Sequence, residues 1–196
     1  MHESADVLSW IGVTVSGRTL NNLRYADDIV LIAITPTALQ QLIDKVDAVS
    51  RDYGLEISMR KTKVTSEGRD HTFTCNGEAL DQVESFRYLG SVITSTGDCS
   101  VEISSRLGIA RLALTSMNNL WKDRALNKET KVRLMRALVW PVVTYGCESW
   151  TLKASDKKRI AGFDMTAYRR MLRISWKDHR TNQSILEELN TIMHDC

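Results

Sequence analysis

The sequence predicts an α+β fold, in which a strand-rich part precedes an all-helical part. Up to residue 96, short apolar segments alternate with polar residues or follow turn residues. Beyond residue 97, apolar residues recur every three or four positions, which is typical of packed helices. The net charge changes with this pattern, from −6 over residues 1–105 to +11 over residues 106–180. We therefore expect two domains, residues 1–96 and 97–196.

The composition is that of a globular protein, with 43% hydrophobic and 26% charged residues in a chain of 196. No stretch approaches the roughly 20 apolar residues of a membrane helix, and the first residues do not read as a signal peptide. We expect an intracellular protein, nuclear or cytoplasmic, with no membrane partner. The four cysteines lie too far apart for a zinc site, so reduced thiols without a disulfide partner are expected: Cys75, Cys99, Cys147 and Cys196.

Two consecutive β-hairpins are predicted between residues 13 and 34. The first turns at Gly17, and the second carries the adjacent Asp27 and Asp28 at its tip. The following run, residues 29–34, is too apolar for an exposed strand and too short for a membrane span. We therefore expect a buried strand packed under helices, with the two carboxylates buried at its edge.

Asp27 and Asp28 are the candidate catalytic and metal-binding residues. Two carboxylates about 4 Å apart in a protein-like dielectric repel by roughly 4 kcal/mol. Divalent cations relieve that cost, as paired metals do in nucleotidyl transfer. For the dipeptide on its own, a solvated turn between strands is the alternative.

One amphipathic helix of about 16 residues follows. Thr35 is expected as its N-cap, Pro36 at its first position and Gly54 at its C-terminal end. A strand should then run over residues 55–59 and bend near residues 60–61, where the apolar alternation changes phase. Further along, Asn76 and Gly77 predict a tight hairpin turn.

The second part is predicted to contain three long helices and a short one. The first spans about five turns over residues 103–121. Asn127 should cap the second, which Pro141 should kink or end, and Ser155 should cap the third. The last covers residues 185–189.

The basic charge of the second part favours a polyanion, usually nucleic acid, whereas solvated helix faces are the alternative. The candidate contacts are Arg106, Arg111, Lys122, Arg169 and Arg170, which we expect on outward faces. We expect Trp121 in the core. Trp150 and Trp176 could stack on bases or fill a core.

The run Tyr25-Ala26-Asp27-Asp28 with the apolar residues after it resembles the catalytic hairpin of reverse transcriptases. The lead-in, residues 17–24, resembles the non-long-terminal-repeat (LINE-type) retrotransposon branch. Residues 120–124, 137–150 and 174–178 resemble the thumb and post-polymerase region of the same proteins. The resemblance covers about residues 11–190.

This resemblance implies a partial reverse-transcriptase palm in residues 1–96, an antiparallel sheet with a covering helix. It implies a thumb-like helical region in residues 97–196. In the complete parent enzyme, Asp27 and Asp28 would bind Mg²⁺ or Mn²⁺. The implied partners are an RNA template, a DNA primer and deoxynucleoside triphosphates.

The segment Gly54–Lys63 also resembles one that follows the catalytic hairpin of reverse transcriptases. It implies that Lys61 approaches the phosphates of the incoming nucleotide, with Tyr25 and Lys63 near nucleic acid. Tyr88, Leu89 and Gly90 resemble the primer grip, which holds the end of the growing strand. On spacing alone, a solvated Lys-Thr-Lys and an edge strand with a glycine bulge are the alternatives.

Polymerases of this family take a third metal-binding aspartate from a strand well upstream. Before Asp27 the sequence has only Asp6, in a segment unlike that motif. We therefore expect a C-terminal fragment of a LINE-type endonuclease-reverse transcriptase, with little or no polymerase activity by itself. A non-catalytic nucleic-acid-binding remnant and a degenerate retroelement product are the alternatives.

Overall fold

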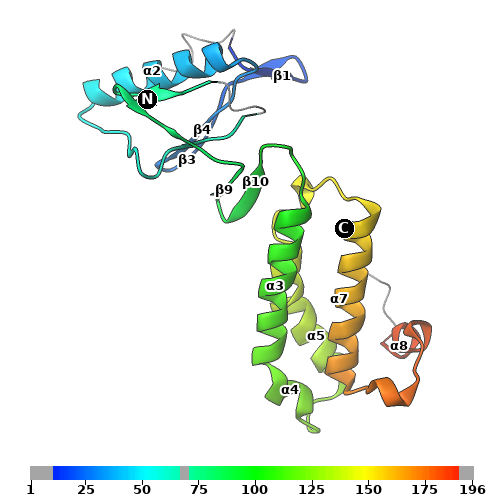
Figure 1. Ribbon diagram of the computed structural model, residues 1–196. Coiled ribbons are helices and arrows are strands. Elements are labelled where there is room, and N and C mark those ends of the chain that lie inside the picture. The colour runs from blue at the N-terminus through cyan, green and yellow to red at the C-terminus, as the bar shows by residue number, and fades with distance from the viewer. Residues whose placement is uncertain (1–10, 67–70, 190–196) are drawn as a thin grey trace. The chain divides into compact units, whose positions relative to one another are not determined.

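The computed structural model describes residues 11–66 and 71–189 (Figure 1). They divide into two compact units. The strand-rich unit holds the described residues up to Phe86 together with residues 94–96, and the helical unit holds residues 87–93 together with the described residues from Gly97 onward. The mixture of strands and helices confirms the α+β class. Compactness does not identify what each unit does, so the division into palm and thumb stays a prediction.

Short strands, paired two by two, form the strand-rich unit. The antiparallel pairs are β1 (Val13–Val15) with β2 (Arg18–Leu20), β3 (Asn22–Tyr25) with β4 (Asp28–Leu31), and β6 (Thr74–Cys75) with β7 (Glu78–Ala79). β5 (Lys63–Val64) pairs in parallel with β8 (Asp81–Gln82). Within the described residues the expected antiparallel sheet is thus a set of separate pairs. The turn between β6 and β7 is the predicted one, with Asn76 and Gly77 at φ 57° and 79°.

Helix α2 (Pro36–Asp52) packs against strands β4 and β6, so the predicted covering helix is present (Figure 1). The Thr35 hydroxyl accepts a hydrogen bond from the Ala38 amide at 3.2 Å, and Gly54 adopts φ 69° just beyond the helix end. Under α2 lies a small apolar cluster, which consists of Ile43, Val64, Phe73, Cys75 and Leu80.

Two predictions for this unit are wrong. Strand β4 ends at Leu31 and is only half-buried, and Ile34 is 75% exposed. A hairpin of two strands has one covered face, so it cannot bury an unbroken apolar run. Residues 55–58 form no strand. Ile57 and Met59 still pack against the apolar cluster, without hydrogen-bonding to a neighbouring strand. The predicted bend is present as a turn over residues 59–61, where the Lys61 amide donates to the Ser58 carbonyl at 3.0 Å.

The helical unit is built on packed α-helices. They are α3 (Ser100–Ser116), α4 (Asn118–Lys122), α5 (Lys128–Leu138), α6 (Trp140–Val143), α7 (Ala154–Leu172) and α8 (Asn182–Leu189), with the 3₁₀ turns η1 (Cys147–Ser149) and η2 (Trp176–Asp178). Helix α3 packs against α6 and α7, and α8 packs against α5 and α7. Figure 1 shows the long helices α3 and α7 running alongside each other. The hairpin of β9 (Ser85–Tyr88) and β10 (Ser91–Thr94) leads into α3.

One core runs through this unit, and Trp121 lies in it at 1% exposure, as predicted. Its indole Nε1 donates to the Leu114 carbonyl at 2.9 Å. In a continuous helix that carbonyl would bond the amide of residue 118. The expected helix over residues 103–121 is therefore two helices, which meet at Met117.

The boundaries of the later helices follow their capping residues. The Asn127 side chain accepts from the Thr130 amide at 2.8 Å, and α5 ends at Leu138, before Pro141, as predicted. Helix α7 begins at Ala154 with Lys153 at the N-cap, so the predicted cap at Ser155 is wrong. The start of α7 is held from α3, because the buried Asp156 accepts from the Ser100 hydroxyl at 3.1 Å.

No helix in the described part of the chain is both long and apolar enough to cross a bilayer. Cys75, Cys99 and Cys147 are free cysteines. Asp6 and Cys196 lie outside the described residues.

Candidate active-site hairpin and nucleic-acid interface

The β3–β4 hairpin carries the two candidate catalytic carboxylates. Tyr25 pairs with Asp28, so Ala26 and Asp27 form a two-residue turn. Asp27 lies in this turn and Asp28 begins β4, and both are exposed. Tyr25 is 65% exposed beside them. The expected burial of the carboxylates is therefore wrong, because they occupy the tip of the hairpin and water solvates them.

Ala26 explains how the chain turns so sharply at this point. Its φ of 53° is left-handed, a conformation that costs an L-residue roughly 1–2 kcal/mol. Positive φ at the first turn position matches the twist of the two strands, which offsets that cost. The left-handed backbone at Ala26 thus lets the two strands close around the acidic tip.

The two lysines predicted to act with this hairpin belong to the same strand-rich unit. Lys61 is exposed on the turn after α2, and no hydrogen bond or ion pair among the described residues joins it to Asp27 or Asp28. Lys63 pairs with the carboxylate of Asp81, its register partner across the β5–β8 pair. Their proposed roles toward nucleotide and nucleic acid stay predictions.

The two aspartates have the carboxylate chemistry that Mg²⁺ and Mn²⁺ prefer. Across residues 11–66 and 71–189, however, no group of three or more His, Cys, Asp or Glu side chains is placed to hold a metal ion.

Tyr88, Leu89 and Gly90 lie at the turn between β9 and β10. Leu89 and Gly90 have φ 46° and 85°, so this is a tight two-residue turn and not an edge strand with a glycine bulge. Leu89 is 39% exposed, and Gly90 is exposed as well. The residues that resemble a primer grip are therefore presented on a turn within the helical unit.

Three of the five candidate phosphate contacts bind other parts of the helical unit. Arg106, which we expected to face outward, has an 11% exposed side chain that pairs with Glu102 and donates to the Gly90 carbonyl at 2.6 Å. Arg170 donates to Asn118 and to Thr115, both at 3.0 Å. The orientation expected for Arg106 is wrong, because the buried Glu102 one turn earlier holds the guanidinium against the protein.

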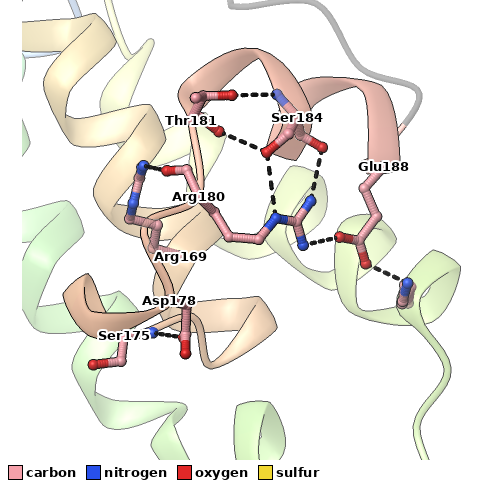
Figure 2. Close-up of polar contacts among 8 residues, drawn as sticks. Arg169, Ser175, Asp178, Arg180, Thr181, Ser184 and Glu188 are labelled. Atoms are coloured by element: carbon pink, nitrogen blue, oxygen red, sulfur yellow. Dashed lines mark hydrogen bonds and ion pairs between the residues drawn. The ribbon is translucent and has the colours of Figure 1, made fainter.

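Arg169 also bonds internally, at the base of helix α8 (Figure 2). It donates to the Arg180 carbonyl at 2.7 Å and to Asn182 at 3.0 Å. Both acceptors are neutral, as are those of Arg170, so the positive charge of these arginines is not cancelled by these bonds. Arg111 and Lys122 are exposed on α3 and α4.

Charged contacts fasten α8 to the rest of the unit, and we call this set the α8 brace: Lys128, Arg180 and Glu188 (Figure 2). Arg180 bonds the Glu188 carboxylate at 2.5 Å and the Ser184 carbonyl at 2.9 Å. Hydrogen bonds from Lys128 and Arg180 lower the pKa of Glu188. Part of the positive charge in the sequence is therefore used for structure.

Two residues that bond to the β9–β10 hairpin, Glu102 and Tyr145, were not predicted from the sequence to do so. Glu102 is 2% exposed and accepts from the Val92 amide at 2.8 Å. Tyr145 donates its hydroxyl to the Leu89 carbonyl at 2.7 Å. The four-residue spacing of Glu102 and Arg106 was a readable signal for an ion pair. No local signal pointed to Tyr145, because only the fold brings it to a turn 56 residues away.

Comparison with known proteins gives two matches. The family model of reverse transcriptase (RNA-dependent DNA polymerase) matches residues 6–93. An uncharacterized transposon-derived protein of Caenorhabditis elegans is 31% identical over an alignment of 184 residues, and the alignment covers 91% of this chain. The chain spans 66% of that relative's length.

The first match contains the acidic hairpin and extends to the β9–β10 turn, and the second covers both units. Reverse transcriptases normally use divalent metal ions, a nucleic-acid template and primer, and nucleotide substrates. Together with the hairpin that presents Asp27 and Asp28, the two matches support a reverse-transcriptase-like retroelement protein.

Proposed function

We propose that this chain is part of the reverse transcriptase of a LINE-type retrotransposon, comprising a partial palm (residues 1–96) and a thumb-like region (residues 97–196). The parent activity is RNA-directed addition of deoxynucleotides to a primer 3′ end. The observation that carries the proposal is the exposed tip of the β3–β4 hairpin. There, Tyr25-Ala26-Asp27-Asp28 closes in a two-residue turn inside the segment similar to reverse transcriptases.

In the proposed parent enzyme, Asp27 and Asp28 supply carboxylate oxygens at the reacting end of the primer. Mg²⁺ or Mn²⁺ bound there would stabilise the charge that develops on the transferred phosphate. Lys61 would add a positive charge near the nucleotide phosphates. Tyr25 and Lys63 would contact nucleic acid beside the hairpin.

The chain alone is proposed to have little or no polymerase activity, because two neighbouring carboxylates leave a divalent cation under-coordinated. Primer extension on an RNA template, with Mg²⁺ or Mn²⁺, tests this with the wild-type chain and Asp27→Asn. We expect the same background incorporation from both. Incorporation that Asp27→Asn abolishes would contradict the inactivity while supporting the assignment of Asp27.

Binding of a primer–template duplex is the activity proposed for the chain itself, which is also the behaviour of a non-catalytic remnant. Arg111 and Lys122 favour it, because both are exposed cations on the helical unit. Arg169 and Arg170 add positive charge that their neutral partners do not cancel. We expect an affinity that falls steeply as salt rises, since each phosphate contact releases counterions.

The salt dependence of binding tests these contacts one at a time. Arg111→Ala and Lys122→Ala should each lower the log–log salt slope by about 0.7–0.9 if the residue contacts one phosphate. Arg18→Ala is the matched control, because Arg18 is an exposed arginine of the strand-rich unit. A wild-type affinity that does not change with salt would contradict the proposed binding.

A further inference from the structure

The turn between β9 and β10 is held by side chains from two other elements of the helical unit. Its two carbonyls are both occupied: Tyr145 donates to Leu89 at 2.7 Å, and Arg106 donates to Gly90 at 2.6 Å. The amide of Val92, two residues further on, donates to Glu102 at 2.8 Å. Three consecutive side-chain contacts thus fix the backbone of one short exposed turn.

The three side chains that hold the turn also hold one another, and we call them the turn clamp: Glu102, Arg106 and Tyr145. Arg106 Nε lies 2.5 Å from the Glu102 carboxylate. The centre of its guanidinium lies 4.2 Å from the centroid of the Tyr145 ring, a cation–π contact. Contacts with Arg106 therefore help to orient the side chains of Glu102 and Tyr145, which also bond to the turn.

The backbone around the clamp leaves little freedom. Gly146 has φ 73°, and a Cβ added there would lie 3.0 Å from the Ser91 hydroxyl. A Cβ on Gly90 would lie 3.6 Å from the Tyr145 hydroxyl. The chain after Tyr145 thus runs close against the residue that follows the turn, which is an arrangement suited to holding the turn in one conformation.

We propose that Glu102, Arg106 and Tyr145 are positioning residues, which orient the Tyr88-Leu89-Gly90 turn so that it holds the 3′ end of a primer. This inference rests on the proposed function. The clamp leaves the apolar side chain of Leu89 39% exposed. It also donates hydrogen bonds to the two carbonyl oxygens, whose partial negative charge would otherwise repel a phosphate. It also explains why Arg106 lies against the protein and not on an outward face.

The test compares two DNA–RNA hybrid duplexes of the same sequence, one with a recessed DNA 3′ end on the RNA template strand and one in which that 3′ end is closed by a hairpin loop. The wild-type chain should bind the open end about three- to tenfold more tightly. Tyr145→Phe removes only the hydroxyl and keeps the ring under Arg106. It should bring the ratio of the two affinities close to one, with the salt slope and thermal melting unchanged.

Tyr53→Phe is the matched control, because Tyr53 is 60% exposed at the end of α2 in the other unit. Arg106→Lys is the second variant, since it keeps the charge and loses the planar fork, and it should lower the ratio as well. A merely structural role would change melting or overall affinity and leave the ratio intact.

The outcomes separate the two proposals. Wild-type preference for the open end that Tyr145→Phe removes supports the clamp. Duplex binding by the wild type with no such preference, or a preference that survives in Tyr145→Phe, overturns the clamp and leaves the nucleic-acid-binding function standing. Absence of binding to either duplex overturns both.

Discussion

The two units of this protein differ in how they obtain their stability. In the strand-rich unit, the buried apolar cluster under α2 is small. In the helical unit, one core connects every α-helix from α3 to α8. The residues that resemble a catalytic centre thus lie in the unit with the smaller core, and the strongest packing lies where nucleic-acid binding is proposed.

The residues proposed for chemistry and the residues that form the larger buried core therefore lie in different parts of the chain. The acidic hairpin needs only a two-residue turn and solvent around it, so its geometry depends little on burial. The β9–β10 turn is held by side chains from α3 and from the turn after α6, so we expect its conformation to depend on the folding of the helical unit. Four predictions test or sharpen this contrast.

The largest effect is expected from Trp121→Ala. This indole is 1% exposed and bonded to the Leu114 carbonyl, so its loss should destabilise the helical unit by about 3–5 kcal/mol. Urea unfolding followed by helical circular dichroism measures the change. Trp176→Ala, at a site 78% exposed, is the control and should change little. Equal losses from both substitutions would mean that Trp121 does not anchor this core.

Phe73→Ala should give the next largest effect, in the other unit. Phe73 is 2% exposed, but its cluster is small and can collapse around the cavity, so we expect a loss near the low end, about 3 kcal/mol. Native-state hydrogen exchange should show faster exchange in α2 and unchanged exchange in α7. If the amides of α7 also exchange faster, the two units do not unfold independently.

Two helix caps allow the same substitution to be compared in both units. Thr35→Ala removes the cap of α2, and Asn127→Ala removes the cap of α5, each at a cost of about 1 kcal/mol. We expect Thr35→Ala to speed amide exchange in α2 more than Asn127→Ala speeds it in α5, because the smaller buried cluster contributes less stability to its unit. Urea midpoints and amide exchange measure both, and a larger effect at Asn127 would reverse the contrast.

The smallest effect is expected from acid. The pKa of Asp98 is lowered to about 2 by hydrogen bonds from Lys153 and Ser100 at the start of α3. A carboxyl whose folded-state pKa lies below the ordinary 3.8 stabilises the fold above about pH 4, and this contribution is lost as the pH falls toward 2. Asp98→Asn should reduce the amount by which the urea midpoint falls between pH 5 and pH 2. Asp123→Asn is the control, because Asp123 is an exposed aspartate after α4. If Asp123→Asn reduced the fall of the urea midpoint as much as Asp98→Asn does, this result would argue against the Lys153 contact.

Local features were predicted well from the sequence. The caps at Thr35 and Asn127, the turn at Asn76-Gly77 and the acidic hairpin each depend on a residue and its immediate neighbours. Turn and capping chemistry is short-range, so these signals survive without knowledge of the fold. Burial of Trp121 was also predicted, because it falls on an apolar stripe of helical spacing.

The cap predicted at Ser155 is a local failure, because α7 begins one residue earlier, at Ala154. The other failures concern features that depend on distant partners. The expected burial of residues 29–34 and the strand at residues 55–59 both needed neighbouring strands, which the described residues do not supply. Arg106 was placed outward because helical spacing tells which face a side chain occupies, not what another segment brings to it. Tyr145 reaches Leu89 across 56 positions, and no local pattern carries that information.

The α8 brace has a consequence for the order in which this protein assembles. Lys128 and Glu188 are 60 positions apart, so closing that loop costs chain entropy that a single exposed ion pair does not return. Because Ile185 and Leu189 of α8 also enter the core beside α5 and α7, we expect helix α8 to dock after those two helices have come together. During synthesis, it would be the last described element of the helical unit to settle, and its docking rate would report on whether the rest of that unit has finished folding.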